Sequence, residues 1–95
     1  MSWTILYHRD VSEDLESIGP TAARRVMRAI DEKLIQAPLQ FGAPLSQNLA
    51  GFRKLRVGDY RVVYRVVATR VLVYVLAVGP RRDKEIYADA VRRLE

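Results

Sequence analysis

The chain has 95 residues, 49% of them hydrophobic, which is enough for about one small domain spanning residues 1–95. It contains no cysteine, and this excludes a disulfide framework and a thiolate metal site. The net charge is +5, and residues 51–95 hold eleven Lys or Arg against five Asp or Glu. This asymmetry is typical of a protein with a polyanionic partner but also of a merely solvated basic surface, and the placement of the charges must decide between them.

No stretch of the sequence is suited to crossing a membrane. The longest apolar run, Val71 to Val78, has eight residues, whereas a helical span needs about 20. The opening residues MSWTILYHRD also lack the basic and apolar regions of a secretory signal. We therefore expect a cytoplasmic protein with no membrane segment.

The N-terminal part predicts a strand followed by a helical hairpin. Trp3, Ile5 and Tyr7 alternate with Ser2, Thr4 and Leu6 in the manner of a short strand. Asp10 and Glu13 resemble a capping box that starts a first helix. Pro20 suits the first turn of a second helix, which Pro38 closes. The two helices are expected to pack antiparallel.

Residues 37–51 mix Pro, Gly, Asn and Ser and predict a loop, after which a β-hairpin begins. Its turn is Gly58-Asp59, with Gly at the first central position of a type II′ turn. Alternation then sorts the side chains into two faces. One face is apolar and holds Leu55, Val57, Tyr60, Val62 and Tyr64; the other is cationic and holds Lys54, Arg56, Arg61 and Arg65, with Phe52 and Val63 among them.

The C-terminal part predicts one more strand and a helix. Residues 71–78, VLVYVLAV, have the composition of a central strand covered on both faces, and Gly79 and Pro80 end it. Apolar residues recur at helical spacing from Asp83 onward and leave Arg93 for solvent. The predicted order is β-α-α-β-β-β-α, an α+β fold with a largely antiparallel four-stranded sheet.

Two runs, LAGFRKLRVGDYRVVYRV and VLVYVLAVGPRRDKEIYADAVRRL, are similar to the signature of the RelE group in the RelE/ParE superfamily of toxins. The resemblance implies a RelE-like fold and a translation-blocking endoribonuclease that cuts mRNA in the ribosomal A site. It further implies a site without metal or cofactor, contacts with ribosomal RNA, and neutralisation in a hetero-oligomer with a cognate antitoxin. The basic half of the chain predicts that this antitoxin is acidic.

Cleavage by 2′-hydroxyl attack needs a proton acceptor, a group that stabilises charge on phosphorus, and a proton donor for the leaving oxygen. The chain has one histidine, His8, expected to be structural, so a two-histidine mechanism is excluded. The resemblance implies Lys54, Arg61, Arg81 and Tyr87 instead. Arg61 is suited to hold the phosphate and Arg81 to stabilise developing charge. Neighbouring cations favour phenolate and neutral amine, so Tyr87 or Lys54 would accept the proton.

Further basic residues near this set are expected to contact RNA phosphates: Arg53, Arg56, Arg65, Arg82 and Lys84. Phe52 occupies a place that is basic in many toxins resembling this one. Either a neighbouring arginine compensates, or the enzyme is slower, or the ring stacks on an RNA base. The alternative is packing against the stem of Arg65.

Other interpretations remain open on the residues alone. Tyr87 could be a half-buried packing residue and Arg61 could balance Asp59. A gyrase inhibitor without nuclease activity, as in the ParE branch, shares the superfamily fold, and function resides in the site and not in the fold. A degenerate toxin retained as an antitoxin-binding partner is a third possibility, suggested only by Phe52.

Overall fold

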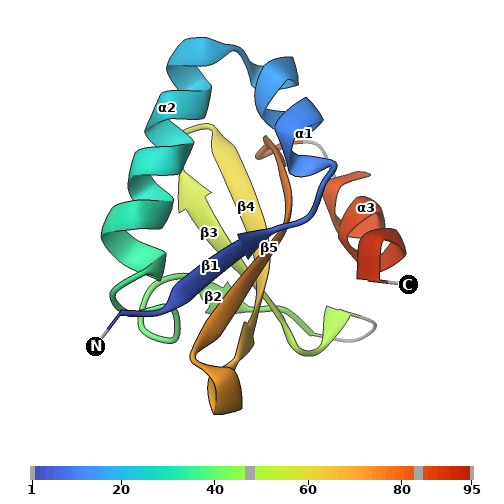
Figure 1. The fold of residues 1–95 in the computed structure, drawn as a ribbon. Helices are drawn as coiled ribbons and strands as arrows, with labels where there is room; N and C mark the ends of the chain where they lie inside the picture. The colour runs from blue at the N-terminus through green and yellow to red at the C-terminus, as the bar shows by residue number, and fades with distance from the viewer. Residues whose placement is uncertain (1, 47–48, 83–84, 95) are drawn as a thin grey trace.

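The computed structural model describes residues 2–46, 49–82 and 85–94, and it shows a twisted sheet with helices on both faces (Figure 1). The elements agree with the predicted α+β fold. In chain order they are β1 (Thr4–Tyr7), α1 (Val11–Ile18), α2 (Pro20–Ala29), a π-helical turn (Ile30–Leu34), β2 (Ala43–Pro44), β3 (Phe52–Val57), β4 (Tyr60–Val67), a 3₁₀ turn (Ala68–Arg70), β5 (Leu72–Pro80) and α3 (Glu85–Leu94).

The sheet has five strands in the order β1-β5-β4-β3-β2, so the predicted number of four was wrong. The additional strand is β2, whose two residues pair antiparallel with β3 at the edge of the sheet. Two residues are too few to produce an alternating pattern, and a proline is tolerated at a sheet edge because its missing N–H is not needed there. Strand β1 runs parallel to β5, and the other pairs are antiparallel.

The two N-terminal helices pack against each other as predicted, but their ends differ from the prediction. The Asp10 side chain makes no capping hydrogen bond; instead its backbone N–H donates to Nδ1 of His8 at 3.1 Å. Helix α2 ends at Ala29 and continues as a π-helical turn in which the Ile35 N–H donates to the Ile30 carbonyl. Within the described ranges, no helix is long and apolar enough to cross a membrane.

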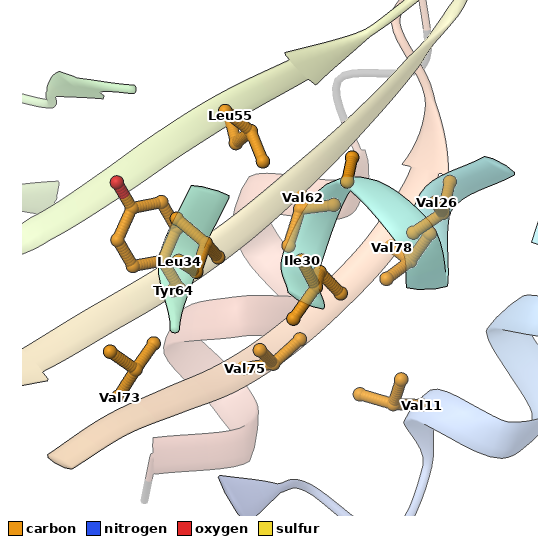
Figure 2. Packing of buried hydrophobic residues seen from close by; sticks show 11 residues of the cluster. Val11, Val26, Ile30, Leu34, Leu55, Val62, Tyr64, Val73, Val75 and Val78 are labelled. Carbon is orange, nitrogen blue, oxygen red and sulfur yellow. The ribbon is translucent and has the colours of Figure 1, made fainter. Parts of the chain in front are cut away.

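The sheet buries a hydrophobic cluster on each face. On one face, α1, α2 and the π-helical turn cover the apolar side of the hairpin (Figure 2), as Leu55, Val62 and Tyr64 pack with Ile30 and Leu34. These side chains are at most 4% exposed. On the other face, α3 covers a smaller cluster that contains Phe52, Val63, Leu76, Ala77, Ile86 and Ala90. Helix α3 is therefore attached to the opposite side of the sheet from the helical hairpin.

An ion pair joins α1, β5 and α3. The Arg93 guanidinium donates to both carboxylate oxygens of Asp14, at 2.7 and 3.0 Å, and to the Leu76 carbonyl at 2.8 Å. Asp14 also accepts the Val78 N–H at 3.0 Å. Strand β1 ends opposite Val75, so the pair supplies partners for backbone groups on the free edge of β5. The hydrogen bond from Arg93 to Asp14 is the main cause of the raised pKa of Arg93.

This arrangement corrects the prediction that Arg93 faces solvent. Its side chain is 8% exposed and that of Asp14 15%. Helical periodicity correctly placed Arg93 outside the apolar stripe of α3. Periodicity does not reveal that the Asp14 carboxylate of α1 lies beside Arg93.

Arg93→Ala should lower the free energy of unfolding by about 3 kcal/mol, because it leaves a mostly enclosed carboxylate without its cation. The neighbouring Arg92 is the matched control, since its side chain is 69% exposed and pairs with Asp89 on the same helix. Arg92→Ala should change the stability by less than about 0.5 kcal/mol. Urea unfolding measures both variants, and equal losses would show that the Asp14 pair is not a structural tie.

Candidate active site

The β3–β4 hairpin places two arginines directly opposite each other. Its register pairs Val57 with Tyr60 and Arg56 with Arg61, as predicted. Gly58 has φ 58°, and Asp59 is not among the residues with positive φ, which agrees with a type II′ turn and not with type I′. Like charges directly opposite in a sheet are destabilising, so the fold holds Arg56 and Arg61 together at a cost to stability.

The face that carries these arginines is only partly cationic. Toward the far end of the hairpin, Phe52 and Val63 lie beneath α3 in the smaller hydrophobic cluster, and Phe52 is 7% exposed. Packing is therefore the correct interpretation of Phe52, whose ring belongs to the smaller hydrophobic cluster and which pairs with Arg65 on the neighbouring strand. Its ring is not accessible to an RNA base.

Arg61 on β4 contacts Tyr87 on α3. Arg61 Nη1 donates a hydrogen bond to the Tyr87 hydroxyl, and its Cζ lies 5.3 Å from the centroid of the tyrosine ring. Both side chains are partly exposed. The ring of Tyr87 also packs against the smaller cluster, so this tyrosine combines a packing role with a contact to a cation.

Strand β5 ends at Pro80, two residues later than predicted, and this extension positions Arg81. Gly79 pairs with Arg61 and Pro80 with Tyr60, so the strand does not end at Gly79. The Arg81 N–H donates to the Asp59 carbonyl at 2.7 Å, which holds Arg81 beside the hairpin turn. Arg82 follows it and is exposed, where it lines a small hollow of about 320 Å³ with Asp59 and Tyr60.

The cations meet in a groove with a volume of about 600 Å³. We call it the basic groove, and its lining consists of Lys33, Phe41, Gly42, Ala43, Lys54, Leu55, Arg56, Arg61 and Arg81. Five of these nine residues are Lys or Arg and none is acidic. Across residues 2–46, 49–82 and 85–94, no salt bridge joins any of the five to a carboxylate. Such a concentration of unpaired positive charge attracts phosphate groups.

Not every predicted RNA-contacting residue belongs to this groove. Arg53 lies on the other face of β3, where its guanidinium donates to the carbonyls of Leu39 at 3.1 Å and of Phe41 and Gly42 at 3.5 Å. Arg65 is exposed but pairs with Phe52, away from the hairpin turn. Lys84 lies outside the described residues.

Five lining residues of the groove were not among the predicted site residues, and Lys33 and Phe41 are the two of them with a charged or aromatic side chain. Lys33 follows α2 in the π-helical turn, and Phe41 belongs to the segment predicted as a plain loop. They reach the hairpin only through the tertiary fold, so no spacing pattern marks them. His8, by contrast, lies at the other end of the sheet near Tyr74, consistent with a structural role.

The chain is similar to known toxins over most of its length. The family model described as the ParE toxin of the type II toxin-antitoxin system, parDE, matches residues 5–85. The mRNA interferase toxin RelE of Escherichia coli (strain K12) is 29% identical over 98 residues, covering 99% of each chain. Toxin RelG of Mycobacterium tuberculosis (strain ATCC 25618 / H37Rv) is 31% identical over 83 residues, covering 87% of this chain and 95% of its own.

A solved structure has the same fold. In the crystal structure of a RelBE toxin-antitoxin complex from Mycobacterium tuberculosis, one chain matches with a TM-score of 0.80 and 30% sequence identity. The match covers 85% of the present chain and 100% of that chain.

Proposed function

Because the chain belongs to the ParE toxin family of type II toxin-antitoxin systems, we propose that it is the toxin of such a system and that it blocks translation. Its activity is that of an endoribonuclease which cuts mRNA in the ribosomal A site by attack of the 2′-hydroxyl. The nearly full-length similarity to a protein named mRNA interferase toxin supports this activity.

The contact between Arg61 and Tyr87 at the basic groove carries the proposal. A phosphodiester entering the groove meets an arginine that has no carboxylate partner among the described residues and is therefore available to an anion. A phenolic oxygen lies within hydrogen-bonding contact of the same guanidinium. A phosphate held by Arg61 would consequently lie near a group able to exchange protons with the adjoining ribose.

The residues divide the reaction among them. Arg61 binds the scissile phosphate and stabilises the charge that builds up as the 2′-oxygen bonds to phosphorus. Tyr87 or Lys54 takes the 2′-proton, and the bond from phosphorus to the 5′-oxygen breaks to leave a 2′,3′-cyclic phosphate. Arg81 stabilises the charge on the departing 5′-oxygen, which takes its proton from water. Arg56 and Arg82 hold flanking phosphates, whereas the guanidinium of Arg53 is already engaged with loop carbonyls.

The gyrase-inhibitor alternative has less support. The relatives similar over most of the chain are named as an mRNA interferase and as the toxin RelG. A protein that inhibits gyrase by binding alone also has no need for a phenol in contact with a phosphate-binding arginine. A translation reaction distinguishes the two functions, because an mRNA interferase leaves cut mRNA and a gyrase inhibitor leaves the mRNA intact.

Arg61→Ala should reduce mRNA cleavage on programmed ribosomes by at least about 10²-fold, because the loss of one donor to the developing charge has that cost. Arg70→Ala is the control, since Arg70 is exposed in the turn at the opposite end of β4. Primer extension maps the cuts, and thermal unfolding checks that both variants fold. Intact mRNA with wild-type protein, together with gyrase trapped on DNA, would overturn the proposed function.

Tyr87→Phe tests the role of the phenol separately. The ring of residue 87 should keep its packing against the smaller hydrophobic cluster, so the melting temperature should stay near that of the wild type. Single-turnover cleavage should fall by roughly 10²-fold, the usual scale for losing a proton-transfer group. Ribosome binding should hardly change, because phosphate contacts dominate it. Unchanged cleavage would show that the phenol does not accept the 2′-proton, and that role would then be assigned to Lys54.

We also propose that an acidic antitoxin forms a hetero-oligomer with this chain and covers the basic groove. A chain that matches this one was solved within a toxin-antitoxin complex. The cations of the groove have no carboxylate partner among the described residues and therefore complement an acidic segment. The association rate constant should fall as salt rises from 50 to about 500 mM, because screening removes long-range attraction. Stopped-flow mixing measures this, and a rate independent of salt would contradict electrostatic steering.

A further inference from the structure

An exposed aromatic ring lies at the border of the basic groove. Phe41 is 40% exposed although it is large and apolar, and it lines the groove together with Lys54, Arg56 and Arg61. Lys33 lies over the ring with Nζ 5.8 Å from its centroid. An apolar ring bordered by cations fits an RNA nucleotide, since the base offers a flat apolar face and the phosphate a negative charge.

The backbone around Phe41 is held from several directions. The Tyr64 hydroxyl lies 2.8 Å from the carbonyl oxygens of both Pro38 and Phe41. Arg53 donates to carbonyls on either side, as described above, and the Phe41 N–H donates to the Ala37 carbonyl at 3.0 Å. Burial raises the pKa of Tyr64 above its ordinary value, which favours the neutral hydroxyl that donates here.

Gly42 permits this close attachment. Its φ is 74°, and a Cβ there would lie 2.4 Å from the Tyr64 hydroxyl and 2.6 Å from the Lys54 carbonyl. The following residues, Ala43 and Pro44, then pair with β3. The ring of Phe41 is thus presented from a backbone fixed on both sides, and a fixed aromatic ring loses little conformational entropy when a base stacks on it.

We propose that Phe41 is a base-stacking platform for the mRNA, with Lys33 binding the phosphate of the stacked nucleotide. This inference rests on the proposed function and assigns a subsite to the same groove. It explains why a phenylalanine is left exposed between cations, where a soluble surface would favour a polar residue. It also assigns Lys33 and Phe41 to substrate binding and not to catalysis.

The first test is single-turnover cleavage on programmed ribosomes. Phe41→Ala and Phe41→Leu should both be slower by about tenfold or more, the effect of losing one base–aromatic stack. Phe41→Trp should retain the wild-type rate, because it keeps a stacking surface. Leu39→Ala is the matched control, since Leu39 is 53% exposed in the same segment and does not line the groove.

The second test measures stacking directly. The probe is a ten-nucleotide, 2′-O-methylated RNA that cannot be cut and carries 2-aminopurine, whose fluorescence is quenched on stacking. Wild type and Phe41→Trp should quench it at low salt, and Phe41→Ala should not. Quenching and cleavage by Phe41→Ala equal to wild type would overturn the inference, as would a defect of this variant in antitoxin binding alone.

The two proposals fail in different ways. If the wild type quenches the probe through Phe41 but does not cut mRNA on ribosomes, the proposed function is wrong and the platform remains as an RNA-binding site. If the wild type cuts mRNA and Phe41→Leu cuts equally fast, the platform is wrong and the proposed function remains.

Discussion

The ion pair between Asp14 and Arg93 connects helix α1 to helix α3. Helices α1 and α3 lie on opposite faces of the sheet and share no hydrophobic cluster. Their charged side chains meet at the free edge of β5, where they also bind Leu76 and Val78. A helix of ten residues is marginal by itself, so the orientation of α3 depends on this tie and on the small cluster beneath it. The position of Tyr87 over Arg61 depends on both.

The basic groove can form because the stability of the hairpin comes from the hydrophobic cluster on its other face. Arg56 and Arg61 oppose each other across the hairpin, and no described carboxylate neutralises them. The repulsion is tolerated because the same two strands bury Leu55, Val62 and Tyr64 on their other face. Burial of three large side chains contributes several kcal/mol, roughly 1.5–3 for each, while a like-charge cross-strand pair costs about 1 kcal/mol or less. An anion that enters the groove removes that cost on binding.

The sequence predicted features that follow from local periodicity and missed those that depend on tertiary contact. The hairpin register, the two helices and the placement of Lys54 and Arg61 on one face follow from a period of two or of 3.6 residues. The fifth strand was missed because Ala43 and Pro44 are too short to show a period. The partner of Arg93 was missed because Asp14 is 79 positions away in sequence. Lys33 and Phe41 join the groove for similar reasons, through the packing of a π-helical turn and a loop.

Neighbouring side chains of β3 point to opposite faces of the sheet, so the basic groove depends on the register that the hairpin turn sets. Arg53 faces the loop that carries Phe41, whereas Lys54 faces the basic groove. A slip of one residue would exchange the faces, exposing Leu55 and directing Lys54 into the core. The two-residue turn at Gly58 prevents the slip, because its positive φ suits the first central position of a type II′ turn and thereby determines which residues pair. The geometry that buries the core therefore also sets the spacing of Lys54, Arg56 and Arg61, and the packing of the rest of the fold brings Lys33, Phe41 and Arg81 to them to complete the groove.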